Sequence, residues 1–401
     1  MGNTPNIRFK GFTNDWEQRK LGEVFQEYSE KNHPELPALT IIQGGGTVLR
    51  EESERKLQYD KSSLAGYKMV REDDFIVHLR SFEGGLEKSN HNGLISPAYH
   101  TFHGDEVDSR FYYPYFRSYE FIKHKLVPHV YGIRDGRSID IDGMKTIEIP
   151  WTLYEEQKKI GDYIESLDTL ITLHQRKCDE TKKLKKFMLQ KMFPKKDAKK
   201  PEIRFAGFTD DWEQRKLGDI CSRVQGNDGR MELPTLTISA ANGWMKQEDR
   251  FSGNIAGKEQ TNYTLLHKGE LSYNHGNSKL AKYGTVFSLQ TYEEALVPRV
   301  YHSFKVENES ADFIEYYFAT KIPDRELRKL ISSGARMDGL LNIGYDDFMG
   351  IKMMFPSASE QDKIAEYFRA LDHIITLHQR KCDELKEFKK YMLQNMFPQK
   401  G

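Results

Sequence analysis

The chain of 401 residues contains only three cysteines, at positions 178, 221 and 382, too few for a disulfide framework. No apolar run approaches the ~18 residues that a membrane-spanning helix needs. The first ten residues, MGNTPNIRFK, lack the apolar stretch of a secretory signal. We therefore expect a reduced, cytoplasmic protein without a membrane span.

The motifs of the commonest catalytic sites are also missing. No G-x-x-x-x-G-K-[ST] occurs, which excludes a P-loop, and the absence of His-Glu-x-x-His and Cys-x-x-Cys excludes the commonest zinc arrangements. None of the fourteen prolines is adjacent to another, which excludes an Asn/Asp-Pro-Pro-aromatic methyltransferase loop. A Glu-x-Lys at Glu54–Lys56 has the character of a chance tripeptide in a chain with 30% charged residues. We predict neither a catalytic nor a metal site in this chain.

Neither sign of charge predominates, since 60 Lys and Arg balance 60 Asp and Glu, and this argues against a simple polybasic nucleic-acid binder. One segment is uneven: Lys177–Lys200 holds ten lysines against three acidic residues. A solvated helix end with a linker explains this segment, and so does a strip that contacts DNA phosphates. The sequence leaves both interpretations open.

Two stretches occur twice in the chain. Ile7–Gly22 returns as Ile203–Gly218 with 14 of 16 positions identical, and Leu167–Lys183 returns as Leu371–Glu387 with 13 of 17 identical. The residues between these stretches are mostly different in the two copies. A constant framework around two variable interiors predicts one scaffold that presents two different recognition surfaces.

Each half ends in a segment with helical periodicity, the first from about Glu155 to Met192. Apolar residues spaced alternately by three and four positions are typical of a helix that packs lengthwise against another helix. The predicted packing residues are Ile160, Ile164, Leu167, Ile171, His174 and Cys178 in the first copy, and Ile364, Phe368, Leu371, Ile375, His378 and Cys382 in the second.

The length of these helices predicts their relative direction. A 38-residue helix is roughly 57 Å long, whereas the ten steps from Phe193 to Ile203 span at most roughly 36 Å. The chain is therefore too short to run back along the first helix before the second domain begins. We expect an antiparallel coiled-coil pair with pseudo-twofold symmetry and one globular domain at each end.

The regions before the helices are rich in short β-favouring runs separated by Gly, Asn and Pro. The predicted fold class is thus α+β, with two similar strand-rich domains that are each followed by a long helix. The expected boundaries are 1–152 for the first domain, 153–194 for the first helix, 195–356 for the second domain with a basic linker at 195–202, and 357–401 for the second helix.

Two of the repeated motifs carry a family resemblance. The entry Phe-x-Gly-Phe-x-x-Asp-Trp-Glu-x-x-x-Leu-Gly occurs at Phe9–Gly22 and Phe205–Gly218, and Glu-Gln-x-Lys-Ile begins the helices at Glu156–Ile160 and Glu360–Ile364. Together they resemble the specificity subunit (HsdS) of type I restriction-modification systems, over nearly the whole chain. The resemblance implies a non-catalytic subunit whose target recognition domains each read half of a split DNA site, while the helices set the spacing.

The same resemblance implies the partners. Double-stranded DNA, two methyltransferase (M) subunits and motor-nuclease (R) subunits would bind this chain. S-adenosylmethionine, ATP and magnesium would belong to those partner subunits and not to this chain.

Base reading needs forked donors and acceptors, such as Arg for guanine and Asn or Gln for adenine. The loop after the strand predicted at 73–78, its counterpart after 269–274, and two Gly-Arg loops provide such residues. The candidates are Arg80, Ser81, Phe82, Lys88, Asn90, Asn92, Arg134 and Arg137 in the first domain, and Asn274, His275, Asn277, Lys279 and Arg336 in the second. Two rival hypotheses remain open: a tandem-repeat coiled-coil scaffold that binds protein, and a nuclease with an unrecognised site.

Overall fold

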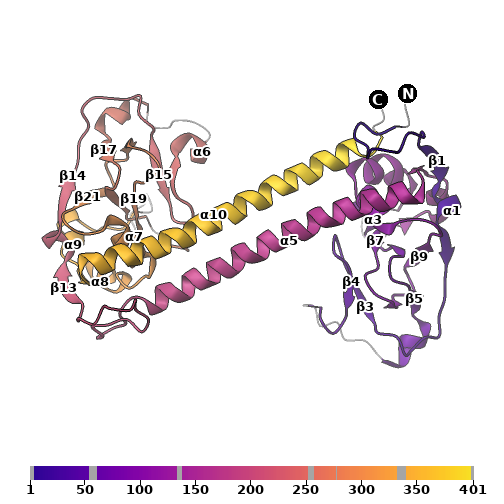
Figure 1. Cartoon of the computed structure of the whole chain (residues 1–401), viewed down its shortest axis with the longest axis horizontal. Helices are drawn as coiled ribbons and strands as arrows, with labels where there is room; N and C mark the ends of the chain where they lie inside the picture. The colour runs from indigo at the N-terminus through magenta and orange to yellow at the C-terminus, as the bar shows by residue number, and fades with distance from the viewer. Residues whose placement is uncertain are drawn as a thin grey trace. The chain divides into compact units, whose positions relative to one another are not determined.

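A computed structural model describes residues 4–53, 61–132, 138–251, 257–276, 278–331 and 340–398. The chain forms two compact units: unit 1 comprises Met1–Gln175 with Gln379–Gly401, and unit 2 comprises Arg176–His378. Two helices of 38 residues each, α5 (Tyr154–Lys191) and α10 (Ala358–Asn395), contribute a part to both units (Figure 1). The predicted long helices are therefore present. Within the described residues, we find no helix with the length and apolar character to cross a bilayer.

Unit 1 builds its globular domain from short elements. The strands are β1 (Glu17–Lys20), β2 (Gln26–Tyr28), β3 (Leu39–Ile42), β4 (Gly46–Leu49), β5 (Lys68–Val70), β6 (Phe75–Val77), β7 (Glu87–Lys88), β8 (Gly93–Ile95), β9 (His100–His103), β10 (Val130–Tyr131), β11 (Ser138–Ile139) and β12 (Glu148–Trp151). The helices are α1 (Leu21–Val24), η1 (Lys61–Gly66), α2 (Ser81–Gly84), α3 (Ser109–Phe116), η2 (Glu120–Leu126), η3 (Val127–His129) and α4 (Ile141–Lys145).

The domain of unit 2 repeats this pattern. Its strands are β13 (Glu213–Lys216), β14 (Cys221–Val224), β15 (Leu236–Ser239), β16 (Gly243–Lys246), β17 (Thr264–His267), β18 (Leu271–Asn274), β19 (Thr285–Ser288), β20 (Glu294–Val297), β21 (His302–Val306) and β22 (Lys352–Phe355). Its helices are η5 (Leu217–Asp219), α6 (Gln247–Phe251), η6 (Gly257–Asn262), α7 (Ala311–Ala319), α8 (Asp324–Leu330) and α9 (Tyr345–Met349).

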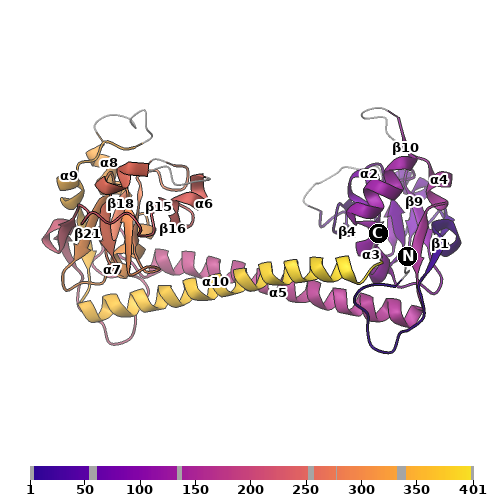
Figure 2. The ribbon, with the colours of Figure 1, turned by 90° about the horizontal axis from the view of Figure 1, so that it is seen from above.

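The two domains share one sheet topology. A four-stranded antiparallel sheet has the order β2-β9-β6-β7 in unit 1 and β14-β21-β18-β19 in unit 2. Three two-stranded ladders occur in both units: β1-β12, β3-β4 and β5-β8 in unit 1, and β13-β22, β15-β16 and β17-β20 in unit 2. Unit 1 also contains the ladder β10-β11. The fold is thus a mixture of helix and strand, with the strands gathered in the globular domain of each unit (Figure 2).

A buried ion pair ties the start of each domain to its long helix. In unit 1 the guanidinium of Arg8 binds both oxygens of Glu156 at 2.6 and 2.8 Å. The indole nitrogen of Trp16 donates to the same carboxylate at 3.1 Å, and so does the hydroxyl of Thr152 at 2.5 Å. Glu156 is fully buried, so these four donors replace the water that its charge would otherwise need.

The repeated residues of unit 2 form the equivalent ion pair. Arg204 binds the two oxygens of Glu360 at 2.6 and 2.7 Å, and Glu360 is also fully buried. In both units the arginine that precedes the entry motif thus pairs with the glutamate of the Glu-Gln motif.

The end of one helix completes the core of each unit. Met396 and Phe397, which follow α10, belong to the core of unit 1 around Trp16. Met192 and Phe193, which follow α5, belong to the core of unit 2 around Trp212. The backbone joins at these places as well, because the amide of Ile7 donates to Asn395 at 2.9 Å and that of Ile203 donates to Lys191 at 2.9 Å. We call this backbone hydrogen bond the helix–entry junction.

Inside each unit the segments of α5 and α10 run in opposite directions. In unit 1, Lys389 binds Asp168 at 2.5 Å, and the thiol of Cys382 lies 3.9 Å from the carbonyl oxygen of Ile171. In unit 2, Lys185 binds Asp372 at 2.6 Å. The thiol of Cys178 lies 3.8 Å from the carbonyl oxygen of Ile375 in that unit. Residues nearer the C-terminal end of α5 thus contact residues nearer the N-terminal end of α10.

Of the twelve residues predicted for helix packing, eight are buried and four are partly buried. The buried ones are Ile160, Ile164, Leu167, Cys178, Ile364, Phe368, Leu371 and Cys382. The partly buried ones are Ile171, His174, Ile375 and His378. Ile160, Ile164, Ile364, Phe368 and Leu371 also belong to the cores of the globular domains, so the start of each helix packs against its own domain.

Candidate nucleic-acid interface

The loop after β6 carries the first candidate readers. Arg80 is the most accessible of them, with 69% of its side chain exposed, and its Nε donates to Glu83 at 2.8 Å. Ser81 is buried, and its hydroxyl accepts a hydrogen bond from the amide of His78 at 2.9 Å. Phe82 is partly buried. Arg80 is therefore placed to reach a ligand, whereas Ser81 shapes the turn that presents it.

Three further candidates follow in and after β7. Lys88 is half-buried in an ion pair with Asp73 at 2.6 Å. The side-chain nitrogen of Asn90 donates to the carbonyl oxygens of Gly45 at 2.9 Å and Thr47 at 3.0 Å. Asn92 is exposed, and its side-chain oxygen accepts from the amide of Glu72. Asn90 and Asn92 thus bind neighbouring backbone, and for Asn90 that backbone is the turn between β3 and β4.

In unit 2 the loop after β18 is joined to a second loop. Gly276 forms an isolated antiparallel bridge with Leu340, and the amide of Leu341 donates to the carbonyl of His275 at 2.9 Å. Asn274 is partly buried, His275 is 8% exposed, and Lys279 is exposed. The structure therefore brings the segment after β18 together with the segment that starts at Leu340. Arg134, Arg137, Asn277 and Arg336 lie outside the described residues.

Two partly buried histidines lie beside these loops. Burial lowers the pKa of His78, next to Ser81, and of His302, next to His275. The ring of His302 lies 4.9 Å from that of His275, centroid to centroid, and its Nε2 is 2.9 Å from the carbonyl oxygen of Ile343. A carbonyl can only accept, so Nε2 carries the proton in the neutral ring. A histidine that is neutral at physiological pH therefore lies beside each of the two loops.

A carboxylate that the sequence did not single out organises the neighbouring hairpin. Glu87 on β7 is fully buried and accepts hydrogen bonds from the amides of Gly44 at 2.8 Å and Gly46 at 3.2 Å. It also accepts from the hydroxyl of Tyr113 at 2.7 Å and pairs with Arg117. In sequence, Glu87 is one of many glutamates beside a lysine, and only the fold reveals that it is buried.

Six of the ten lysines at 177–200 form ion pairs within their own unit. Lys185 binds Asp372, Lys191 and Lys195 bind Glu202, and Lys200 lies 3.2 Å from Asp211. This pairing favours the interpretation of the segment as a helix end with a linker.

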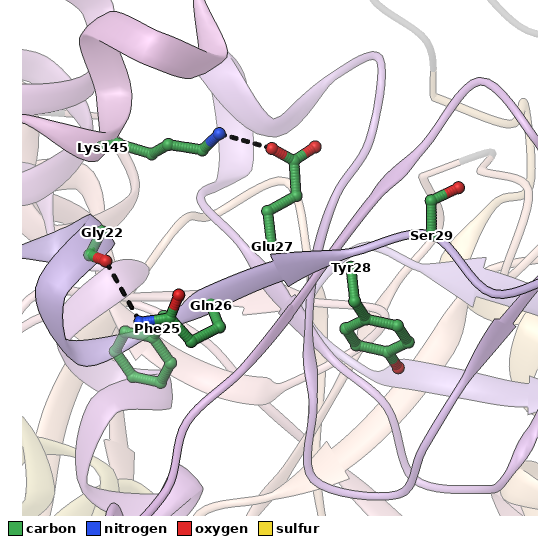
Figure 3. Close-up of a pocket in the computed structure, with 7 residues that line it drawn as sticks. All are labelled: Gly22, Phe25, Gln26, Glu27, Tyr28, Ser29 and Lys145. Carbon is green, nitrogen blue, oxygen red and sulfur yellow. Dashed lines mark hydrogen bonds and ion pairs between the residues drawn. The ribbon is translucent and has the colours of Figure 1, made fainter.

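A surface pocket of about 320 Å³ opens in unit 1, away from these loops (Figure 3). It is lined by Gly22, Phe25, Gln26, Glu27, Tyr28, Ser29 and Lys145. Lys145 and Glu27 neutralise each other across it at 2.5 Å. Burial opposes ionisation of Glu27, yet hydrogen bonds from Lys145 and His100 outweigh it and lower the pKa of this carboxyl. Among the residues that the structure describes, no three metal-ligating side chains gather into a possible metal site.

Comparison with known proteins places this architecture. Residues 209–387 match the family described as type I restriction modification DNA specificity domain. The second half of the chain thus contains a type I restriction-modification DNA specificity domain. The matched residues lie in the second half, and the first half carries the same entry and helix motifs.

Solved structures were also compared with this chain. An S subunit of a type I restriction-modification system from M. genitalium matches with a TM-score of 0.59 and 14% identity, over 99% of this chain and 100% of that one. The HsdS subunit from Thermoanaerobacter tengcongensis matches with a TM-score of 0.44 and 16% identity, over 95% of this chain and 96% of that one. The first similarity extends the shared fold over nearly the full length of the chain.

Proposed function

We propose that each globular domain of this specificity subunit reads one half of a bipartite, asymmetric DNA target. The observation that carries the proposal is the combination of one sheet topology and one buried framework with two different sets of loops. A constant framework holds each reader in the same way, and unlike loops read unlike sequences. Since this function needs no chemistry from the chain itself, the subunit acts as a recognition component and not as an enzyme.

In this proposal α5 and α10 form one antiparallel coiled coil with pseudo-twofold symmetry, which fixes the spacing between the half-sites. Support comes from the equivalent contacts in the two units, Lys389 with Asp168 and Lys185 with Asp372. Asp168 and Asp372 are equivalent positions of the repeat, and so are Lys185 and Lys389. In each ion pair the aspartate of one helix therefore binds the equivalent lysine of the other.

The same helices would dock the methyltransferase subunits. Each unit leaves apolar side chains exposed on its helix segments, and three of the exposed positions correspond between the copies. They are Leu170, Phe388 and Tyr391 in unit 1, and Ile374, Leu184 and Phe187 in unit 2. Large exposed apolar side chains on a helix favour protein–protein contact. Two M subunits would bring S-adenosylmethionine, and R subunits would bring the ATP- and magnesium-dependent motor and nuclease.

Exchange of one domain tests the bipartite reading. Residues 23–150 are replaced by the equivalent segment of another specificity subunit, and the modified bases of a genome that encodes the hybrid with its M subunits are sequenced. We expect one half of the target to change and the other half to stay the same. A change in both halves would contradict modular reading, and DNA modification that is absent even with the unaltered chain would favour the protein-binding scaffold.

A matched pair of insertions tests the spacing role. Four residues are added after Gln175 in α5 and four after Gln379 in α10, so that the ion pairs on either side stay aligned. The helices gain about 6 Å, and the spacer should lengthen by about two base pairs. The same insertion in α5 alone is the control, because it misaligns one of the two ion pairs. An unchanged spacer with the matched pair would contradict the ruler role.

A further inference from the structure

Two β-hairpins have the same geometry in the two domains. β3 pairs with β4 and closes at Ile42 opposite Gly46, and β15 pairs with β16 and closes at Ser239 opposite Gly243. Each turn contains three residues, 43–45 and 240–242, before a glycine with a φ of +70° or +69°. Glycine is needed there because this left-handed conformation is strained for other residues.

The tips of these hairpins differ in sequence. The first reads Gln-Gly-Gly and the second Ala-Ala-Asn. Each tip thus carries one carboxamide side chain, Gln43 in the first and Asn242 in the second, and both residues are exposed. A common backbone with different polar tips is the arrangement expected of an element that distinguishes two half-sites.

The first hairpin is held by the buried carboxylate of Glu87. Glu87 binds the amides of Gly44 in the tip and of Gly46 after it, and its carboxylate is fixed in turn by Tyr113 and Arg117. The amide of Gly45 donates to the carbonyl oxygen of Ile42. These three backbone donors are therefore occupied, and the side chain of Gln43 is exposed.

The second hairpin is held by different contacts. The ring of Phe287 packs against Gly243, where an added Cβ would lie 3.3 Å from two ring carbons. The carbonyl of Ile238 accepts hydrogen bonds from Arg250 at 2.8 Å and from Asn274 at 3.2 Å. Different side chains therefore support the equivalent hairpin in each domain.

The first tip also forms one surface with the candidate reading loop. A Cβ built on Gly84 would lie 2.1 Å from the amide nitrogen of Gln43, so the tip touches the loop that presents Arg80. In unit 2, the side chain of Asn274 at the end of β18 donates to the carbonyl oxygen of Ile238 on β15 at 3.2 Å.

We propose that the tips of these two hairpins read bases, with Gln43 and Asn242 as specificity-determining residues. The inference rests on the proposed DNA-reading function and adds two positions to it. A two-stranded β-ribbon fits the major groove of B-DNA, and a carboxamide can donate to N7 and accept from the N6 amino group of adenine. Each tip thus specifies an adenine in its own half-site.

The test uses the full chain assembled with its M subunits, and the modified sites of genomic DNA are sequenced. In Gln43→Ala we expect one adenine of the first half-site to lose its discrimination by about 10- to 100-fold, with the second half-site unchanged. Asn242→Ala should give the reverse result. Gln43→Glu should shift the preference toward cytosine, because a carboxylate only accepts, and the N4 amino group of cytosine donates.

Matched controls are available on the framework. Gln18 on β1 and Gln214 on β13 are exposed glutamines that are identical in the two copies. Gln18→Ala and Gln214→Ala should leave both half-sites unchanged. If the unaltered chain gives a bipartite target and the tip variants, with unaltered melting temperatures, modify the same sites, the hairpin proposal is wrong while the specificity function stands. A single contiguous target from the unaltered chain would instead overturn the proposed function.

Discussion

Phe397 provides a direct test of which helix end completes which core. The residue follows α10 and is 6% exposed in unit 1. Its ring centroid lies 5.0 Å from that of Phe111, 5.7 Å from Tyr115 and 6.0 Å from Trp16. Its counterpart in unit 2 is Phe193, whose ring lies 5.6 Å from Phe313.

Replacement of this ring by a methyl group should destabilise unit 1 alone. Phe→Ala at buried positions costs about 3–5 kcal/mol, and the upper part of that range applies where the surroundings cannot collapse. Trp16 and Phe111 are themselves nearly fully buried, so they have little freedom to close the cavity. Phe397→Ala should therefore lower the free energy of unfolding of unit 1 by about 3–5 kcal/mol, with unit 2 unaffected.

Hydrogen exchange followed by mass spectrometry on the full chain separates the two units. An effect of this size corresponds to an exchange rate about 150- to 4,000-fold faster for core amides that exchange through unfolding of the unit. Peptides that cover α3 should show it, whereas those that cover α7 should not. Phe193→Ala should give the opposite pattern. Phe388 on α10 is 44% exposed, so Phe388→Ala should change the free energy of unfolding that protects the core amides by less than about 0.5 kcal/mol.

One result would refute the assignment of helix ends to cores. If Phe397→Ala accelerated exchange in α7, or left α3 as protected as in the unaltered chain, the end of α10 would not belong to the core of unit 1.

Three further predictions concern the framework, pH and connectivity. Glu156→Ala leaves Arg8 buried without its carboxylate and should cost unit 1 about 3–5 kcal/mol in chemical denaturation; a cost below about 1 kcal/mol would contradict a structural role. Because the pKa of His302 is lowered in the folded state, the unfolded chain takes up this proton first, so the stability of unit 2 should fall as pH drops below about 6.5. His302→Gln should flatten that decline in melting curves at pH 7.5 and 5.5, and an equal decline would assign it to other groups. A permuted chain, with residue 401 joined to residue 1 and new ends at residues 197 and 198, should fold with both helix–entry junctions intact, as amide protection at Ile7 and Ile203 would report.

The sequence predicted the long helices closely because their pattern is local. The expected span from Glu155 to Met192 differs from α5 by one residue at each end, since apolar spacing and a following proline define it without tertiary information. The strand predicted at 73–78 likewise contains β6. Periodicity and turn residues were sufficient for both.

The roles of the polar loop residues could not be predicted in this way. In sequence, Asn90 offers the same carboxamide as Gln43, and nothing local shows that one binds a hairpin carbonyl while the other is exposed. Glu87 illustrates the same limit, because its burial depends on Tyr113 and Arg117, which reach it from the region of α3. Such residues are recognised only when segments far apart in sequence are placed together.

The framework contacts bear on the proposed exchange of one globular domain for another. Arg8, Trp16, Thr152 and Glu156 all lie outside residues 23–150, so a replaced interior leaves this ion pair and its hydrogen bonds intact. Several residues of α5 do reach this interior. The side-chain oxygen of Gln157 accepts from the backbone amide of residue 108 at 3.1 Å, and Asp162 and Glu165 pair with Arg110 at 2.7 and 2.8 Å. In unit 2 the equivalent Gln361 accepts from the backbone amide of residue 310 at 3.2 Å. A backbone amide is supplied by any residue except proline, whereas Arg110, and the rings of Phe111 and Tyr115 beside Phe397, are side chains that an exchanged domain would have to match.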